Sequence, residues 1–296
     1  MIDLKLCVTG HHQRYSGTLA GHRTLSSLAC AYLQPDEIAD PLTGLATEPE
    51  EFPAPALFTS VEINAELEAQ AIRLRAVHTP QRSYFTGTEA AFSVAADGSQ
   101  AALTFCTVNP ELWLFGPALI LALARRGVYC LHASAFSDGA AASVIVGNSG
   151  AGKSTLARAI CQRAGAQRLC DDITPITLRA DKLYVLPRFP QLKLTVVDPD
   201  LPEAVPLKRL ILLNAAQAGM ASAHQVLNQR AVFDALTRHT VASRLYSDAD
   251  TRVWWQQMPQ IIAALADARS IRPAFDARAP EHAMLAALDA LDNVCP

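Results

Sequence analysis

One short stretch of this chain combines residues that can bind phosphate. From Gly147 the sequence is G-N-S-G-A-G-K-S-T, which fits the phosphate-binding loop pattern of a glycine, four variable residues and then Gly-Lys-Ser. Glycine has no Cβ, so the backbone can turn tightly and its N–H groups can surround a phosphate chain. Lys153 adds a positive charge, and the Ser154 hydroxyl is a suitable Mg²⁺ ligand. The expected nucleotide-binding residues are Gly147, Asn148, Ser149, Gly150, Ala151, Gly152, Lys153, Ser154 and Thr155.

The residues on both sides of the loop predict the strand and the helix that it requires. Val144, Ile145 and Val146 form a β-branched apolar run, which is typical of a buried strand. A helical pattern begins at Thr155, and a helix N-terminus adds a partial positive charge that favours phosphate. The glycines follow the order G-x-x-G-x-G, which argues against a dinucleotide-binding fold.

Two adjacent acids follow this helix at the end of a short apolar run. The sequence from Arg168 is R-L-C-D-D, so Asp171 and Asp172 stand where a strand should emerge near the phosphate site. In phosphate-loop proteins a carboxylate in this place orders Mg²⁺ or its water. A second acid can act as a base toward an acceptor hydroxyl. An Asp-Asp pair also suits a turn or a helix cap, but the neighbouring phosphate loop favours the functional interpretation.

Composition and charge exclude several classes of function. The chain has 296 residues, of which 50% are hydrophobic, and a formal net charge of −3. Such a composition allows a large core and gives no argument for nucleic-acid or anionic-membrane binding. The longest apolar stretch, Leu112 to Ala124, is shorter than the ~20 residues of a membrane-spanning helix, so we expect a buried helix.

The N-terminus and the cysteines favour a cytoplasmic protein with reduced thiols. Asp3 and Lys5 interrupt any apolar core of a signal peptide. The seven cysteines are scattered without a C-x-x-C pair, which argues against a zinc site. His11 and His12 are followed by no further ligand at suitable spacing, so we expect a polar turn there.

The chain should form two domains, with a boundary at 108/109. Residues 1–108 are expected to be mostly β, with a hairpin turn at Asp97-Gly98 between apolar runs 84–94 and 100–108. Asn109-Pro110 predicts the start of a helix that Pro117 should kink. Further strands are expected at 128–136, 140–146, 182–186, 193–197, 208–213 and 270–272, and helices to about 163 and within 224–246, 253–268 and 280–291. The Trp254-Trp255 pair is interpreted as packing rather than ligand stacking.

Three segments together resemble a known family. They are L-H-A-S-A-F-S-D-G from Leu131, V-I-V-G-N-S-G-A-G-K-S-T from Val144 and R-L-C-D-D from Arg168. Their order resembles the catalytic domain of HPr kinase/phosphorylase and, more broadly, HPr-kinase-like proteins, including lasso-peptide kinases that phosphorylate serine on precursor peptides. The segments P-Q-L-K-L from Pro190 and P-L-K-R-L-I-L-L from Pro206 are also similar to this group. The resemblance covers about residues 110 to 290, and the first hundred residues match no family.

The resemblance implies a fold and a role for each matching residue. It implies a P-loop kinase-like domain of mixed sheet flanked by helices at 109–296. With the smaller, mostly β domain that the pattern of residues 1–108 predicts, the expected fold class is α/β. ATP and Mg²⁺ would be its cofactors, with Lys153 and Ser154 on the β- and γ-phosphates and the metal. Asp171 would be the base toward an acceptor serine, and Asp172 would be associated with Mg²⁺. His132 would lie beside the active site, although its own sequence context is equally typical of a histidine in the core or at a strand end.

The chain also departs from HPr kinase. The spacing from Lys153 to the acid pair is one residue longer, and neither the later acidic signature motif nor the arginine-containing loop near the C-terminus has a counterpart. These departures argue against HPr as acceptor and against the reverse phosphorolysis. The ATP site remains intact.

Three functions therefore remain open at this point. The chain is expected to phosphorylate serine of a peptide or protein, with residues 1–108 either docking the substrate or only packing. A kinase for a small hydroxylated metabolite and a nucleotide-binding NTPase or sensor are the alternatives. The acceptor, the choice of ATP or GTP and the oligomeric state, a homo-oligomer included, are left open by the sequence.

Overall fold

The computed structural model describes residues 4–8, 15–19, 22–26, 34–35, 60–67, 70–106, 110–189, 201–276 and 278–292. The chain divides into two compact units. The first unit comprises Met1–Val128 and Ala242–Val253, and the second comprises Tyr129–Val241 and Trp254–Pro296. The expected strand at 193–197 and the pair His11-His12 lie outside the described residues.

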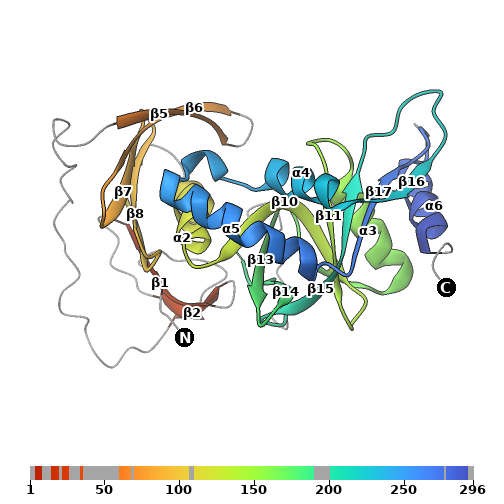
Figure 1. The fold of residues 1–296 in the computed structure, drawn as a ribbon, viewed down its shortest axis with the longest axis horizontal. Coiled ribbons are helices and arrows are strands. Elements are labelled where there is room, and N and C mark those ends of the chain that lie inside the picture. Colours follow the sequence, from red (N-terminus) through yellow and green to blue (C-terminus); the bar gives the residue numbers. More distant parts are fainter. Residues whose placement is uncertain are drawn as a thin grey trace. The chain divides into compact units, whose positions relative to one another are not determined.

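The first unit is built on a nine-stranded sheet of order β4-β2-β3-β1-β9-β8-β7-β6-β5 (Figure 1). Neighbouring strands run antiparallel, except that β1 is parallel to both β3 and β9. Its strands are β1 Leu4–Val8, β2 Tyr15–Leu19, β3 His22–Ser26, β4 Gln34–Pro35, β5 Ser60–Leu67, β6 Gln70–His78, β7 Arg82–Thr86, β8 Ala90–Ala95 and β9 Gln100–Cys106.

The predicted hairpin is present, but one of its arms is divided. β8 and β9 pair across a turn in which Gly98 has φ 69°, as the Asp-Gly signal predicts. The run 84–94 was expected to be one strand and is instead the pair β7 and β8. Gly87 makes the break, where its N–H donates to the Ala90 carbonyl at 2.9 Å. The β signal was therefore correct, while the turn inside it was missed.

A kinked helical segment follows β9 and is almost wholly buried. It comprises α1 Pro110–Trp113, a π-helical turn Leu114–Ala118 and α2 Leu119–Ala124. Gly116, directly before Pro117, leaves the helical region at φ −82° and ψ −112°. Proline lacks the N–H and disfavours helical geometry in the residue before it, which explains the predicted kink.

Because this helical segment packs on the strands before it, the two units divide at a later residue than predicted. It contacts β8 and β9, and Arg125 at its end donates to the carbonyls of Val94 and Ala95 at 2.9 and 3.0 Å. Arg125 also forms a two-bond ion pair with Asp250, at 3.0 and 2.9 Å. The division therefore falls at 128/129, whereas we expected it at 108/109, and residues 242–253 belong with the first unit. The expected boundary followed the change from strand to helix, and that change lies inside one packed unit.

The second unit contains an eight-stranded mixed sheet of order β11-β10-β13-β14-β15-β17-β16, with β12 paired to β10. β15 pairs antiparallel with β14 near its start and parallel with both β11 and β17 along the rest. The strands are β10 Val128–Ser137, β11 Ala142–Val146, β12 Gln167–Cys170, β13 Ile173–Arg179, β14 Lys182–Val185, β15 Val205–Leu213, β16 Ala223–Val226 and β17 Asp267–Arg272. The short edge strand β16, fully exposed, was not predicted.

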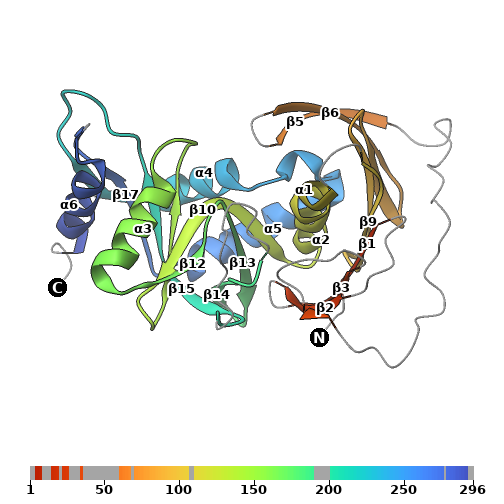
Figure 2. The ribbon, with the colours of Figure 1, turned by 180° about the vertical axis from the view of Figure 1, so that it is seen from behind.

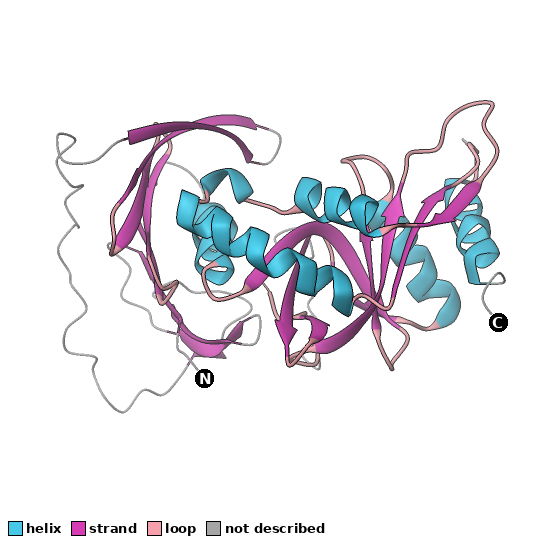
Figure 3. Ribbon diagram, in the orientation of Figure 1, coloured by secondary structure: helices cyan, strands magenta, loops and turns pink. Residues whose placement is uncertain are grey.

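Helices flank this second sheet on both faces. α3 Lys153–Ala164 and α6 Pro280–Asp292 pack together on one face, and α4 Gln229–His239 lies on the other (Figures 1 and 2). A 3₁₀ turn, Ser243–Leu245, and α5 Asp248–Ala264 follow α4. Figure 3 shows the strands of the second unit enclosed between these helices. The expected fold class, a mixed α/β sheet flanked by helices after a mostly β N-terminal unit, is confirmed.

The core of the second unit joins the phosphate-loop helix to the sheet. Ile145 of β11 and Ile211 of β15 pack against Leu156 and Ile160 of α3 and against Leu288 of α6. Burial of these large apolar side chains fixes the position of α3, each contributing roughly 1.5–3 kcal/mol. The start of α3, and with it the predicted phosphate site, is therefore anchored by the core.

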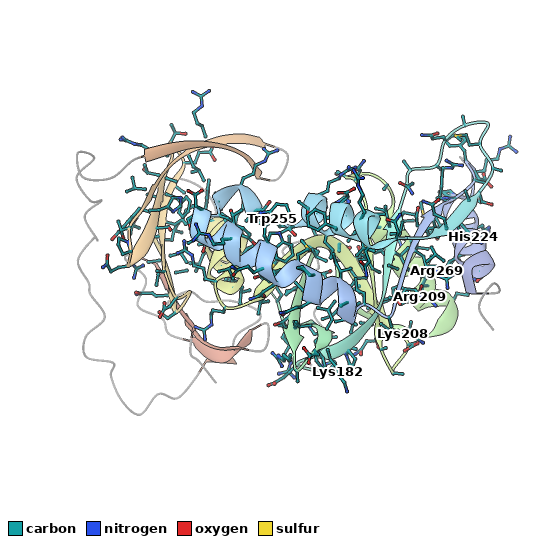
Figure 4. All side chains as sticks on the ribbon, viewed as in Figure 1. Lys182, Lys208, Arg209, His224, Trp255 and Arg269 are labelled. Carbon is teal, nitrogen blue, oxygen red and sulfur yellow. The ribbon has the colours of Figure 1, made fainter. Side chains whose placement is uncertain are left out.

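The two tryptophans behave differently. Trp254 is buried, with its ring centroid 4.1 Å from that of Tyr129, as the packing interpretation predicts. Trp255 is 45% exposed and lies 5.2 Å from the ring of Phe233 (Figure 4).

Candidate functional site

The predicted loop has the local geometry of a phosphate-binding loop. It leaves β11 at Gly147 and enters α3 at Lys153. Gly150 and Gly152 have φ of 78° and 97°, a region that residues with a Cβ rarely adopt. A Cβ on Gly147 would lie 2.4 Å from the carbonyl oxygen of Leu213 in β15. These three glycines are thus required by the backbone path, as the motif predicts.

The first turn of α3 is open to an anion. The N-cap residue is Gly152, which has no side chain to accept from the amides of the first turn. Ser154 is exposed, and Thr155 is half-buried. Lys153 is only 6% exposed, and its Nζ donates to the carbonyls of Gly147 at 2.9 Å and Asn148 at 3.2 Å. The ammonium group is therefore held over the loop whose amides would surround a phosphate.

β10 connects this loop to the acid pair. It runs antiparallel to β11 with Ala133 opposite Val146, so His132 lies level with Gly147, the first residue of the loop. On its other side, the N–H of Ala133 donates to the Asp172 carbonyl at 3.1 Å. The strand thus places His132, the phosphate loop and the two aspartates at one end of the sheet.

The two aspartates have different surroundings. Asp171 is 7% exposed; its Oδ1 accepts from the Ser134 hydroxyl at 2.7 Å, and its Oδ2 accepts from the Arg168 guanidinium. The Asp172 side chain is 30% exposed and lies 3.4 Å from Nε2 of His132, whose side chain is 36% exposed. The structure thus brings His132 and Asp172 together and holds Asp171 by two donors.

Ser134 and Arg168 were not predicted as site residues, although the sequence contained signals for both. Ser134 stands two residues after His132 in a strand, and such residues share a face of the sheet. Arg168 opens the R-L-C-D-D run, three residues before Asp171. Spacing alone did not reveal which carboxylate each residue would contact.

A further histidine lies close to the site. His239 ends α4 and is only 6% exposed. Burial, the positive charge of Lys153 and then the charges of His132 and Arg238 lower its pKa from 6.5 to about 4. Its ring is therefore neutral at neutral pH. His239 was not predicted as a site residue, although Val232, Ala235 and Leu236 share its buried face.

The side chains fit a Mg²⁺ ion that is held mainly by phosphates. In the part of the chain that the structure describes, no three His, Cys, Asp or Glu side chains are grouped to hold a metal ion. Mg²⁺ in phosphoryl-transfer sites is bound through one or two protein oxygens, with phosphates and water completing the shell. The hydroxyl of Ser154 and the carboxylate of Asp172 are oxygens of this kind.

Two buried cysteines lie near the site without a chemical role. Cys130 and Cys170 are free thiols, and burial raises the pKa of each well above its usual range. Both thiols therefore stay protonated and behave as small apolar residues.

Among the described helices, none combines the length and apolar character needed to cross a bilayer.

Comparisons with known proteins add little beyond this geometry. No protein-family description and no curated protein matches the chain. Among solved structures, the Hpr(Ser) kinase/phosphatase from Coxiella burnetii is similar over 56% of this chain and 90% of its own length. The sequence identity is 13% and the TM-score is 0.30.

Proposed function

We propose that this protein is a kinase that transfers the γ-phosphoryl group of Mg-ATP to a serine hydroxyl of a peptide or protein. The observation that carries the proposal is the position of β10. Its backbone pairs with the strand that feeds the phosphate loop on one side and bonds to Asp172 on the other. A phosphate site and a pair of carboxylates beside each other are the two parts that phosphoryl transfer to a hydroxyl needs.

The chemistry follows from these parts. The amides of the loop and the Lys153 ammonium would bind the phosphates, with Ser154 and Asp172 on the Mg²⁺ ion. The metal, when bound, neutralises charge on the β- and γ-phosphates. The acceptor hydroxyl oxygen bonds to the γ-phosphorus as the bond to the bridging oxygen of ADP breaks. Its proton goes to the carboxylate of Asp171.

The surroundings of Asp171 suit a base that must be held still. Ser134 and Arg168 each occupy one site on its oxygens, and a carboxylate has about four such sites. Orientation by two fixed donors supports the positioning on which most phosphoryl-transfer catalysis depends.

The assay that tests the proposal is transfer from Mg-ATP, followed by the intact mass of each acceptor. The acceptors are serine-containing peptides encoded near this gene, free serine and an HPr-type protein. Wild type is compared with Lys153→Ala, which should lose productive ATP use, and with Asp171→Asn, which should bind ATP without transfer. Asp181→Asn, a change at an exposed turn between β13 and β14, is the matched control and should be silent.

Each outcome selects among the three functions. A peptide phosphorylated by wild type and by Asp181→Asn, but not by Asp171→Asn, supports the proposal and the base. Phosphate on free serine instead would indicate a metabolite kinase. ADP release without any phosphorylated acceptor would favour an NTPase. Transfer by Asp171→Asn at the wild-type rate would show that another group accepts the proton.

A further inference from the structure

The buried face of α4 ends in a histidine where an apolar residue would be expected. Val232, Ala235, Leu236 and His239 follow helical spacing and are all buried. The first three are apolar, as the buried face of an amphipathic helix normally is. His239 completes the stripe with an imidazole ring, which carries an N–H donor and a nitrogen acceptor.

Within the described residues, no hydrogen bond reaches either ring nitrogen of His239, although the residue as a whole is only 6% exposed. Neither nitrogen is among the fully buried polar atoms that lack a partner, so each keeps some access to solvent. The ring can therefore accept a ligand atom as its hydrogen-bond partner.

Backbone hydrogen bonds hold the end of α4 against β10, the strand that runs beside the phosphate loop. The residue after His239, Thr240, bridges to Leu131 of β10, and the N–H of Val241 donates to the Cys130 carbonyl at 2.8 Å. The end of α4 is therefore bound to β10 directly before His132. The charges of Lys153 and His132 both lower the pKa of His239, in keeping with this backbone arrangement.

We infer that His239 is a further phosphate-contacting residue, whose ring N–H donates a hydrogen bond to the terminal phosphoryl group of the bound nucleotide. The inference rests on the proposed function, because it takes a nucleoside triphosphate as the ligand. Phosphoryl oxygens are strong hydrogen-bond acceptors. In the proposed complex they lie on the side of the loop that faces the Lys153 ammonium group. A neutral ring adds a donor without adding a second positive charge beside that lysine.

The test is nucleotide affinity in variants of His239, measured calorimetrically for Mg-ATP and Mg-ADP. His239→Leu keeps an apolar side chain of similar size on the buried face and removes the donor. His239→Gln and His239→Asn keep an N–H, each at the distance of a different ring nitrogen. His224→Leu makes the same change on the exposed strand β16 and is the matched control (Figure 4). Thermal unfolding verifies that each variant is folded.

We expect His239→Leu to bind ATP about tenfold more weakly, equivalent to 1.4 kcal/mol, and ADP within about twofold of wild type. One of the two amide variants should recover most of the loss. A purely structural role would weaken both nucleotides equally, and that result would overturn the inference. Wild-type ATP affinity in a folded His239→Leu protein would also overturn it.

The inference and the proposed function can fail separately. If wild type binds ATP, and only the ATP affinity depends on His239, the phosphate contact stands even when no acceptor is phosphorylated. If peptides are phosphorylated but His239→Leu binds ATP normally, the kinase assignment stands and the contact does not. A wild-type protein that binds neither nucleotide would refute both.

Discussion

Protonation of His239 should make the stability of this protein depend on pH between 7 and 4. In the folded chain the pKa of this histidine is lowered from 6.5 to about 4, chiefly by burial and then by the charge of Lys153. The unfolded chain therefore binds a proton before the folded chain does. The free energy of unfolding is therefore highest above pH 6.5, where the ring is neutral in both states, and it falls as the pH falls toward 4. The expected direction is a lower free energy of unfolding in acid.

The magnitude follows from the two pKa values. Between pH 7 and pH 5, the unfolded histidine becomes almost fully protonated, while the folded one remains about nine-tenths neutral. Linkage then gives a loss of about 2 kcal/mol in the free energy of unfolding. Salt at physiological strength will reduce the part that comes from Lys153 less than it would at the surface, because both groups are buried.

Urea unfolding of wild type and His239→Gln at pH 7 and pH 5 measures this loss. Glutamine does not titrate, so every other group contributes equally to both proteins, and the difference between them isolates His239. Wild type should lose about 2 kcal/mol more than the variant over this range. Equal losses would show that the ring is already solvated or paired in the folded chain, and the reasoning from burial would be wrong.

Three further substitutions test the backbone path and the first unit. Gly147→Ala should destabilise by about 3 kcal/mol, because its Cβ would meet the rigid Leu213 carbonyl at 2.4 Å. Gly139 has φ 95° but open space around the position of a Cβ, so Gly139→Ala should cost only about 1–2 kcal/mol. Thermal unfolding of both glycine variants measures these losses. Arg125→Ala should cost about 3–5 kcal/mol, because it leaves the largely buried Asp250 carboxylate without its cationic partner. Urea unfolding followed by circular dichroism measures that loss. A loss below about 1 kcal/mol would show that water can solvate Asp250 about as well as Arg125 does.

Features encoded by neighbouring residues were predictable from the sequence. The phosphate loop depends on glycines within six positions and on the β-branched run before them, so its strand, turn and helix were all expected. The kink at Pro117 and the turn at Gly98 have equally local causes. Asp171 and Asp172 were proposed as site residues because they end a strand, and their place at the end of β12 is also a property of the local sequence.

Features that depend on contacts between distant segments were not predictable. The residues after His239 meet β10 only because α4 ends against that strand, which lies more than a hundred residues earlier in the chain. The edge strand β16 has no buried side, so no alternation of polar and apolar residues marks it. The boundary between the units was misplaced because α2 packs onto strands that precede it. In each case tertiary packing, rather than local preference, decides the outcome.

The conformation of Asp172 explains how two adjacent acids serve one site. Consecutive residues in an extended strand point to opposite faces, so a regular strand would turn one carboxylate away. Asp172 instead has φ 73°, a left-handed conformation that aspartate tolerates better than most residues. As a result Asp171 reaches Ser134 while Asp172 reaches His132, two residues that share a face of β10. Strain at this one residue is what brings both carboxylates to the end of β10 beside the phosphate loop, as strained backbone often does at functional sites.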